Sequence, residues 1–391
     1  MQVSRNTSPR DGSKYRHLAE ELSPHPSGKP NENDVVAELA HQEHTVGVKA
    51  NPQRSPADAA TLAAASAGDQ DAFKCLTDPY IREIHLHCYR MLGSFHDAQD
   101  AVQETLLRAW KYLESLQDPR SFRAWLHRIA TNVCLRQRAH AANDPTMTAV
   151  TLDAFTPTLT PPYHLSPYPD VLLDELQSTG GNPAVEYDLH ESVQLAFLVA
   201  MQVLPPRQRA VLLLHDVVGF TLADIAEMLD TTVASVNSVL NRARATLRQL
   251  RTTGRMRIVA KPLPDEVAES FVERCLAAWQ AADVVRLADL HKADVVMGAP
   301  TWGLRLNGRS TVCQFLGSVP AADQRAKFRF IVTRANRHPA LAVYRLDEIA
   351  ETETYRAVAI VVLTVDGDAA AGIAMFPDPK LMPIFGLPIQ L

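Results

Sequence analysis

The stretch LPPRQRAVLLLHDVVGFTLADIAEMLDTTVASVNSVLNRARATL (residues 204–247) predicts three consecutive helices, the last of them rich in arginine. Its two prolines suit the start of a first helix, and Thr221 suits the N-cap of a second. Asp230-Thr231-Thr232 marks a tight turn before the third. This order is typical of a helix-turn-helix, whose last helix enters the major groove of duplex DNA.

The third helix of this stretch separates an apolar stripe (Val236, Val239, Leu240 and Leu247) from a polar face. The candidate DNA-reading residues are Ser235, Asn237, Ser238, Asn241, Arg242 and Arg244. From Thr231 to Pro264 there are seven basic residues and no acid, which indicates contact with phosphates. A helix pair that binds only protein is the alternative.

A second informative stretch, DAQDAVQETLLRAW (97–110), predicts a helix with an acidic face, because its acids recur at spacings of three and four. A solvated face without a partner is the alternative. Between Arg120 and Asp144 there follow five arginines and no acid, interleaved with aromatic and amide side chains. Such a run suits phosphate contact and base stacking on separated strands. Adjacent helices of opposite charge indicate two partners of opposite charge.

Residues 87–110 (HCYRMLGSFHDAQDAVQETLLRAW) and 121–139 (SFRAWLHRIATNVCLRQRA) resemble region 2 of the extracytoplasmic-function (ECF) sigma factors of RNA polymerase, and 204–247 resembles their region 4. The resemblance implies core RNA polymerase (clamp and flap regions) and promoter DNA as partners. It implies clamp contacts by Asp97, Asp100, Gln103 and Glu104. It implies contacts with the −10 element by Arg123, Trp125, Arg128, Asn132 and Arg136, and contacts with the −35 element by the polar face listed above.

Three positions qualify this resemblance. The family's usual acidic pair is here Gln99-Asp100, which keeps one carboxylate for the clamp. Asn237 stands where many relatives have arginine, which indicates a different base preference, with adenine as one candidate. Trp125 also fits an inward, core position.

The predicted fold is multidomain, with two all-α domains and a C-terminal α+β cone. We expect a disordered leader (1–56), a first helical domain (57–140), an acidic Pro-rich linker (141–185), a second helical domain (186–253), a joint (254–264) and a C-terminal domain (265–391). Residues 141–191 have eight acids and seven prolines but no Lys or Arg, which predicts an extended chain. We hypothesise that these acids mimic nucleic acid in a basic channel of the polymerase.

In the C-terminal domain a predicted helix (267–280) precedes strand-like runs at 327–335, 340–346, 355–365 and 370–376, with a hairpin turn at Asp366-Gly367-Asp368. The pattern resembles the NTF2-like or SnoaL-like cones that some ECF sigma factors carry. This resemblance implies a pocket, for which the candidates are Trp279, Asp289, His291, Trp302 and Arg305. No Asp/His dyad with a clear spacing stands out, so we expect ligand sensing or regulatory docking, with a purely structural role as the alternative.

Composition narrows the class further. The five cysteines have no CxxC spacing, and His85, His87, Cys88 and His96 do not have the spacing of a metal site, so we expect no metal and no cofactor. The chain has no apolar run of membrane-spanning length and no secretory signal, which predicts a cytoplasmic protein that does not use a membrane. We therefore predict a non-enzymatic sigma factor. The alternatives are a helix-turn-helix regulator independent of core polymerase and a SnoaL-like enzyme fused to a DNA-binding module.

Overall fold

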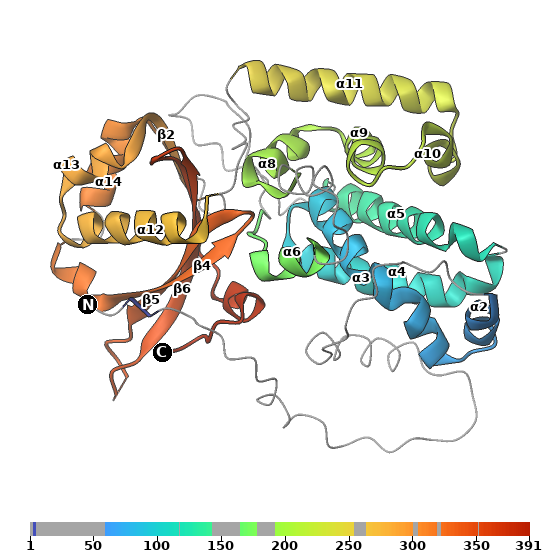
Figure 1. Cartoon of the computed structure of the whole chain (residues 1–391), viewed down its shortest axis with the longest axis horizontal. Helices are drawn as coiled ribbons and strands as arrows, with labels where there is room; N and C mark the ends of the chain where they lie inside the picture. The colour runs from blue at the N-terminus through green and yellow to red at the C-terminus, as the bar shows by residue number, and fades with distance from the viewer. Residues whose placement is uncertain are drawn as a thin grey trace.

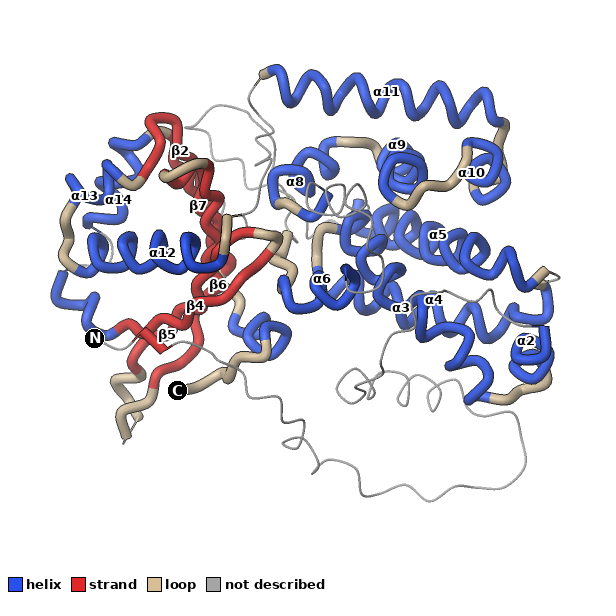
Figure 2. The backbone as a smooth tube through the Cα atoms, in the orientation of Figure 1, coloured by secondary structure: helices blue, strands red, loops and turns tan. Residues whose placement is uncertain are grey.

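A computed structural model describes residues 3–4, 59–116, 118–142, 165–177, 192–253, 263–299, 304–318, 322–350 and 352–391. In these ranges, helices make up the two central domains, and the strands form one sheet, to which the C-terminal domain contributes every strand except Val3–Ser4 (Figures 1 and 2). The predicted multidomain fold class is confirmed. The leader beyond residues 3–4, the joint at 254–262 and Trp302 lie outside the described residues.

The first helical domain consists of α2 (Ala59–Ser66), α3 (Gln70–Leu92), α4 (Phe95–Tyr112) and α5 (Phe122–Ala142), with short 3-10 turns at Leu113–Ser115 and Pro119–Ser121. Gly93 ends α3 in the left-handed conformation (φ 86°), which a side chain would disfavour. The next residue, Ser94, accepts a hydrogen bond from the Asp97 N–H at 3.2 Å and so caps α4. This corner sets the angle between α3 and α4.

The second helical domain consists of α8 (Leu195–Val203), α9 (Pro206–Leu212), a π-helical turn η3 (Leu213–Val217), α10 (Leu222–Met228) and α11 (Val233–Thr252). The predicted N-cap at Thr221 is confirmed. Its hydroxyl accepts the Asp224 N–H at 3.2 Å, and the Asp224 carboxylate accepts the Thr221 N–H at 2.9 Å. Asp230 adopts φ 50° in the turn before α11. The helix-turn-helix is therefore present where the sequence predicts it.

The C-terminal domain runs α12 (Asp265–Gln280), α13 (Val284–Asp289), β2 (His291–Ala299), β3 (Leu304–Asn307), α14 (Arg309–Ser318), η5 (Ala322–Lys327), β4 (Phe328–Ala335), β5 (His338–Leu346), β6 (Tyr355–Asp366), β7 (Ala369–Phe376) and η6 (Pro379–Phe385). The sheet order is β1-β4-β5-β6-β7-β2-β3, where β1 is Val3–Ser4. β1 pairs parallel with β4, and β2 parallel with β7. The predicted turn at Asp366–Asp368 joins β6 to β7, with Gly367 at φ 71°.

The sheet buries both of its faces. One face packs on α12, α13 and α14 through a core that includes Phe271, Val295 and Leu363. The other face belongs to a second core that also runs through both helical domains, so that Tyr344 of β5 and Tyr89 of α3 are members of one cluster. The predicted C-terminal α+β domain is confirmed as one sheet with helices on one face, and it rests against the helical domains (Figure 1).

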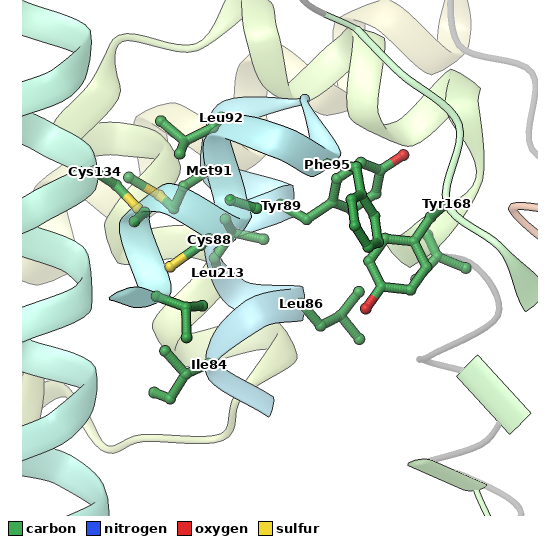
Figure 3. Close-up of a cluster of buried hydrophobic side chains, with 14 of the residues drawn as sticks. Ile84, Leu86, Cys88, Tyr89, Met91, Leu92, Phe95, Cys134, Tyr168 and Leu213 are labelled. Atoms are coloured by element: carbon green, nitrogen blue, oxygen red, sulfur yellow. The ribbon is translucent and has the colours of Figure 1, made fainter. Parts of the chain in front are cut away.

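The linker differs from its prediction where it is described. Asp170–Gln177 form a helix (α6) instead of an extended segment. Before it, Leu165, Pro167 and Tyr168 are buried, and Tyr168 lies beside Tyr89 and Phe95 of the α3–α4 corner (Figure 3). This part of the linker thus belongs to the folded body. Composition could not predict this, because the contacts of Tyr168 are with residues more than 70 positions earlier in the chain.

Candidate polymerase and nucleic-acid interface

The predicted −35 face lies open on α11. All six candidates (Ser235, Asn237, Ser238, Asn241, Arg242 and Arg244) are exposed. Val236 and Leu240 are buried on the opposite side, where α11 packs on α9 and α10. Figure 1 shows α9 and α10 between α11 and α5. The reading side of α11 therefore points away from the first helical domain.

One of these six residues already has a partner within the protein. The Arg244 Nε donates to Asp216 Oδ2 at 3.0 Å, and a second guanidinium nitrogen pairs with the other carboxylate oxygen. The hydrogen bond that Arg244 donates to Asp216 raises the pKa of Arg244. Arg242, by contrast, lies on the exposed face of α11. In this arrangement Arg244 fastens α11 to η3.

The predicted −10 residues lie along α5 in different environments. Arg128 and Arg136 are exposed, whereas Trp125 and Asn132 are half-buried. The Trp125 ring lies 5.9 Å from that of Phe122, which is fully buried. The indole thus contributes to the core and keeps one part accessible, which fits both readings of this residue.

Arg123, the fifth −10 candidate, is held by both helical domains. Its Nε donates to Glu83 Oε1 of α3 at 2.9 Å, and its Nη2 donates to the Val218 carbonyl of the second helical domain at 3.1 Å. Its guanidinium lies 4.7 Å from the Phe220 ring centroid, a cation–π contact. The second helical domain therefore contacts the first turn of α5 and partly covers Arg123.

Glu83 is the centre of this contact. Its carboxylate also lies 3.2 Å from His127 Nε2, and His127 packs edge-on against Phe220 at 5.2 Å. Burial alone would raise the pKa of Glu83. The hydrogen bonds and positive charges of His127 and Arg123 outweigh burial and hold this pKa well below its ordinary value. Glu83 is thus an ionised, nearly buried anchor for α5.

The predicted clamp-binding residues lie on the surface of α4. Asp100 is exposed, and Asp97, Gln103 and Glu104 are half-buried. Glu104 pairs with Arg108 one turn later at 2.5 Å. The opposite side of α4, with Ala98, Ala101 and Ala109, is fully buried. Asp100 is the most accessible carboxylate of this set.

The four described pocket candidates do not meet in one cavity. The Trp279 ring packs against Phe328 and Phe330 and under the Arg325 guanidinium. His291 is buried with Nδ1 2.5 Å from the Leu287 carbonyl, and burial lowers its pKa. Arg305 is exposed on β3. Asp289 lines an open groove between α13 and α14, in which neither Trp279, His291 nor Arg305 takes part.

The histidines near the start of the first helical domain have structural contacts. His85 Nδ1 lies 3.0 Å from the Tyr168 hydroxyl, and His87 Nε2 lies 2.9 Å from Thr131 Oγ1. Across the ranges that the structure describes, no three His, Cys, Asp or Glu side chains are grouped to hold a metal ion. Within the same ranges no helix combines the length and apolar character that a membrane span requires.

Sequence reasoning missed the buried arginines that join the two helical domains. Arg209 of α9, 1% exposed, donates to the carbonyl oxygens of Met201 and Leu204 and, across the interface, to that of Met91 at the end of α3. Arg90 Nη2 donates to Ser192 Oγ at 2.7 Å. Nothing in the local sequence marks either arginine as buried, because the partners that join the domains, the Met91 carbonyl and the Ser192 hydroxyl, lie 118 and 102 residues away.

Comparisons with known proteins agree with this geometry. The Sigma-70 region 2 family matches residues 76–143, and the Sigma-70 region 4 family matches residues 194–247. The chain is 36% identical over 324 residues to the ECF RNA polymerase sigma factor SigG of Mycobacterium tuberculosis, which covers 82% of this chain and 85% of SigG. It is 34% identical over 185 residues to SigW of Bacillus subtilis, covering 47% of this chain and 91% of SigW.

The fold has a counterpart among solved structures. The crystal structure of the Mycobacterium tuberculosis ECF sigma factor SigJ is 23% identical and aligns with a TM-score of 0.50 over 82% of this chain and 100% of SigJ. This likeness extends through the helical domains and into the C-terminal domain, and it concerns the fold. With two sigma-70 regions in order and an ECF relative matched over most of both chains, this protein belongs to the ECF family of RNA polymerase sigma factors.

Proposed function

We propose that this protein brings core RNA polymerase to promoters through three surfaces: the acidic side of α4 for the polymerase, α5 for the −10 element and α11 for the −35 element. One observation carries the proposal. The acidic surface around Asp100 and the polar, basic surface of α11 belong to different domains, and both are exposed. A chain with two exposed faces of opposite character can bind a protein and a nucleic acid at once.

The individual roles follow from chemistry and position. Asp100, with Asp97, Gln103 and Glu104, contacts the clamp, while the second helical domain contacts the flap. Arg128 and Arg136 contact phosphates near the −10 element, with Trp125, Asn132 and Arg123 beside the separated strands. Asn237, Ser238, Asn241 and Arg242 read bases at the −35 element. The protein acts in the cytoplasm, where it meets polymerase and promoter DNA.

For the C-terminal domain we propose a regulatory role without catalysis. Asp289 is exposed and His291 is buried against a backbone carbonyl, so these two residues do not form an acid–base pair. The groove beside Asp289 is a place where a small ligand could bind. Added ligand would then act on transcription and would not be converted.

The test of the polymerase surface is run-off transcription with full-length protein and purified core polymerase. Asp100→Lys should weaken polymerase binding and lower the yield of run-off product, because it reverses an exposed charge and touches no core residue. Glu114→Lys is the matched control, since Glu114 is an exposed acid outside α4. Run-off product that does not depend on the added protein, or equal affinity of the two variants for core polymerase, would contradict the proposal and favour an independent helix-turn-helix regulator.

The test of the −35 surface compares cognate and scrambled duplexes. Asn237→Ala or Arg242→Ala should cost about 1–3 kcal/mol on the cognate site and much less on the scrambled one, if these side chains read bases. Arg248→Ala, also exposed on α11, should weaken binding to both duplexes alike. Equal losses on both duplexes for Asn237→Ala would reduce its role to phosphate contact.

A further inference from the structure

The tip of the β4–β5 hairpin, Asn336-Arg337, enters the junction between the two helical domains. Both residues have left-handed backbone conformations, with φ of 55° and 63°. Asparagine tolerates this region, but arginine rarely adopts it, so surrounding contacts must hold the turn in place. Those contacts come from three other segments of the chain.

Asn336 is fully buried, and its amide joins all three segments. Its Nδ2 donates to the Tyr89 hydroxyl of α3 at 3.0 Å and to the Val193 carbonyl, just before α8, at 2.7 Å. Its Oδ1 accepts the N–H of Tyr168 in the linker at 2.9 Å. The backbone N–H of Asn336 donates to the Tyr168 carbonyl at 2.9 Å. One side chain of the C-terminal domain thereby holds the first domain, the second domain and the linker.

The arginines of the hairpin bind acids of the linker. The Arg337 N–H donates to Asp170 Oδ1 at 2.8 Å, and the Arg337 guanidinium pairs with Asp174. Arg334 Nε lies 3.4 Å from Asp170 Oδ2. Asp170 itself is 3% exposed. Asp170 and Asp174 therefore dock the C-terminal domain in this state, which opposes our hypothesis of nucleic-acid mimicry for these two of the eight acids.

Holding the helical domains together affects the promoter surfaces unequally. Arg123 donates to the Val218 carbonyl only while the second domain rests on α5, and its cation–π contact with Phe220 also depends on that arrangement. Asp100 and the reading side of α11 remain exposed in the same state. Arg128 and Arg136 of the −10 helix are exposed as well, whereas Arg123 is partly covered.

We propose that the Asn336-Arg337 tip is an intramolecular latch: it keeps the two helical domains together with Arg123 partly covered, and its release frees the Arg123 end of the −10 helix. The consequence for transcription rests on the function proposed above, whereas the closure of the domains does not. The latch thus regulates strand engagement and leaves the polymerase surface and the −35 surface accessible.

The first experiment is hydrogen exchange on the full-length chain with Asn336→Gly. Glycine keeps the left-handed turn and deletes the three side-chain hydrogen bonds. We expect the amides of residues 122–134 and 216–222 to exchange about tenfold faster or more. Asp368→Gly is the matched control, because it places glycine in the exposed β6–β7 turn of the same sheet and should leave this exchange unchanged.

A second variant guards against general unfolding. Tyr89→Phe removes the hydroxyl that accepts a hydrogen bond from the Asn336 amide, and it keeps the aromatic ring in the core. It should speed exchange in the same two segments by roughly threefold to tenfold, with β6 still protected. Loss of protection in β6 would show that Asn336→Gly unfolds the sheet, and the test then rests on Tyr89→Phe. The latch is overturned if the variant on which the test rests exchanges at the wild-type rate in both segments.

Run-off transcription with the same variants separates the two proposals. We expect released variants to form open complexes faster than wild type, with unchanged affinity for core polymerase. If exchange quickens but the rate of open-complex formation does not, the latch has no regulatory role. If the wild-type protein and all variants fail to initiate while exchange still quickens, the sigma function fails and the latch stands. If the proteins initiate transcription but their hydrogen exchange is unchanged, the latch fails and the sigma function stands.

Discussion

Replacing Glu83 with glutamine should destabilise the folded protein by about 2–3 kcal/mol at neutral pH. The Glu83 carboxylate accepts hydrogen bonds from Arg123 and His127, and its side chain is 15% exposed. Removing one member of a buried ion pair costs about 3–5 kcal/mol. Arg123 keeps 32% of its side-chain surface in contact with water, which screens part of the interaction and lowers our figure.

The same residue predicts a pH dependence. His127 and Arg123 hold the pKa of Glu83 below its ordinary value of 4.5 in the folded state. The unfolded chain therefore binds this proton more readily than the folded one. The stabilisation is complete above the unfolded pKa and is lost as the pH falls toward the folded pKa. Glu83→Gln lacks this contribution, so its difference from wild type should shrink below about pH 5.

Urea unfolding followed by far-ultraviolet circular dichroism, at neutral pH and at mildly acidic pH, measures both effects. Glu114→Gln is the control, because Glu114 is exposed and should change stability by less than about 0.5 kcal/mol. A Glu83→Gln protein as stable as the control would refute the account of Glu83 as an anchor. A difference from wild type that stays constant with pH would refute the pKa argument alone.

Three further predictions concern the second helical domain. Arg209→Met should cost about 3 kcal/mol or more in urea unfolding, since it leaves buried carbonyls such as that of Met91 without donors; a neutral result would contradict this. Thr221→Ala should cost about 1 kcal/mol in thermal unfolding through loss of the capping box, and an unchanged melting temperature would count against the cap. Asp216→Asn should change stability by less than about 1 kcal/mol but free Arg244, giving tighter and more salt-dependent binding to any duplex in titrations; an unaltered salt slope would show that Arg244 does not reach DNA.

The parts of the fold that sequence predicts are those with local causes. The cap at Thr221 and the turn at Asp230 depend on residues within four positions, and both are where expected. Strands β4 to β7 are predictable from their strand-like runs of residues and from the turn residues between β6 and β7. β2 was missed because its strongest partner, β7, lies far along the chain and its burial pattern is irregular. The helix α6 was not predicted, because the prolines before and after it indicate an extended chain.

The candidate site shows the same division. The resemblance pointed to Arg123 as a DNA contact, and α5 carries it as expected. Its partners Glu83 and Val218 lie 40 and 95 residues away, and no spacing rule connects such positions. No local pattern marks Asn336, because its importance comes from Tyr89, which lies 247 residues earlier. Local patterns and the resemblance predict the surfaces, and contacts between distant residues decide how much of each surface is covered.

The core that the helical domains share with the sheet makes the order of synthesis important. The helical domains leave the ribosome before β4 and β5, so the growing chain exposes the site around Tyr89 and Tyr168 until the hairpin that fills it has been made. Water can satisfy the hydroxyl and carbonyl groups there in the meantime, but the apolar members of the core have no substitute. We therefore expect nascent chains stalled before β4 to be prone to aggregation and to depend on chaperones, although both of their promoter-binding domains are complete.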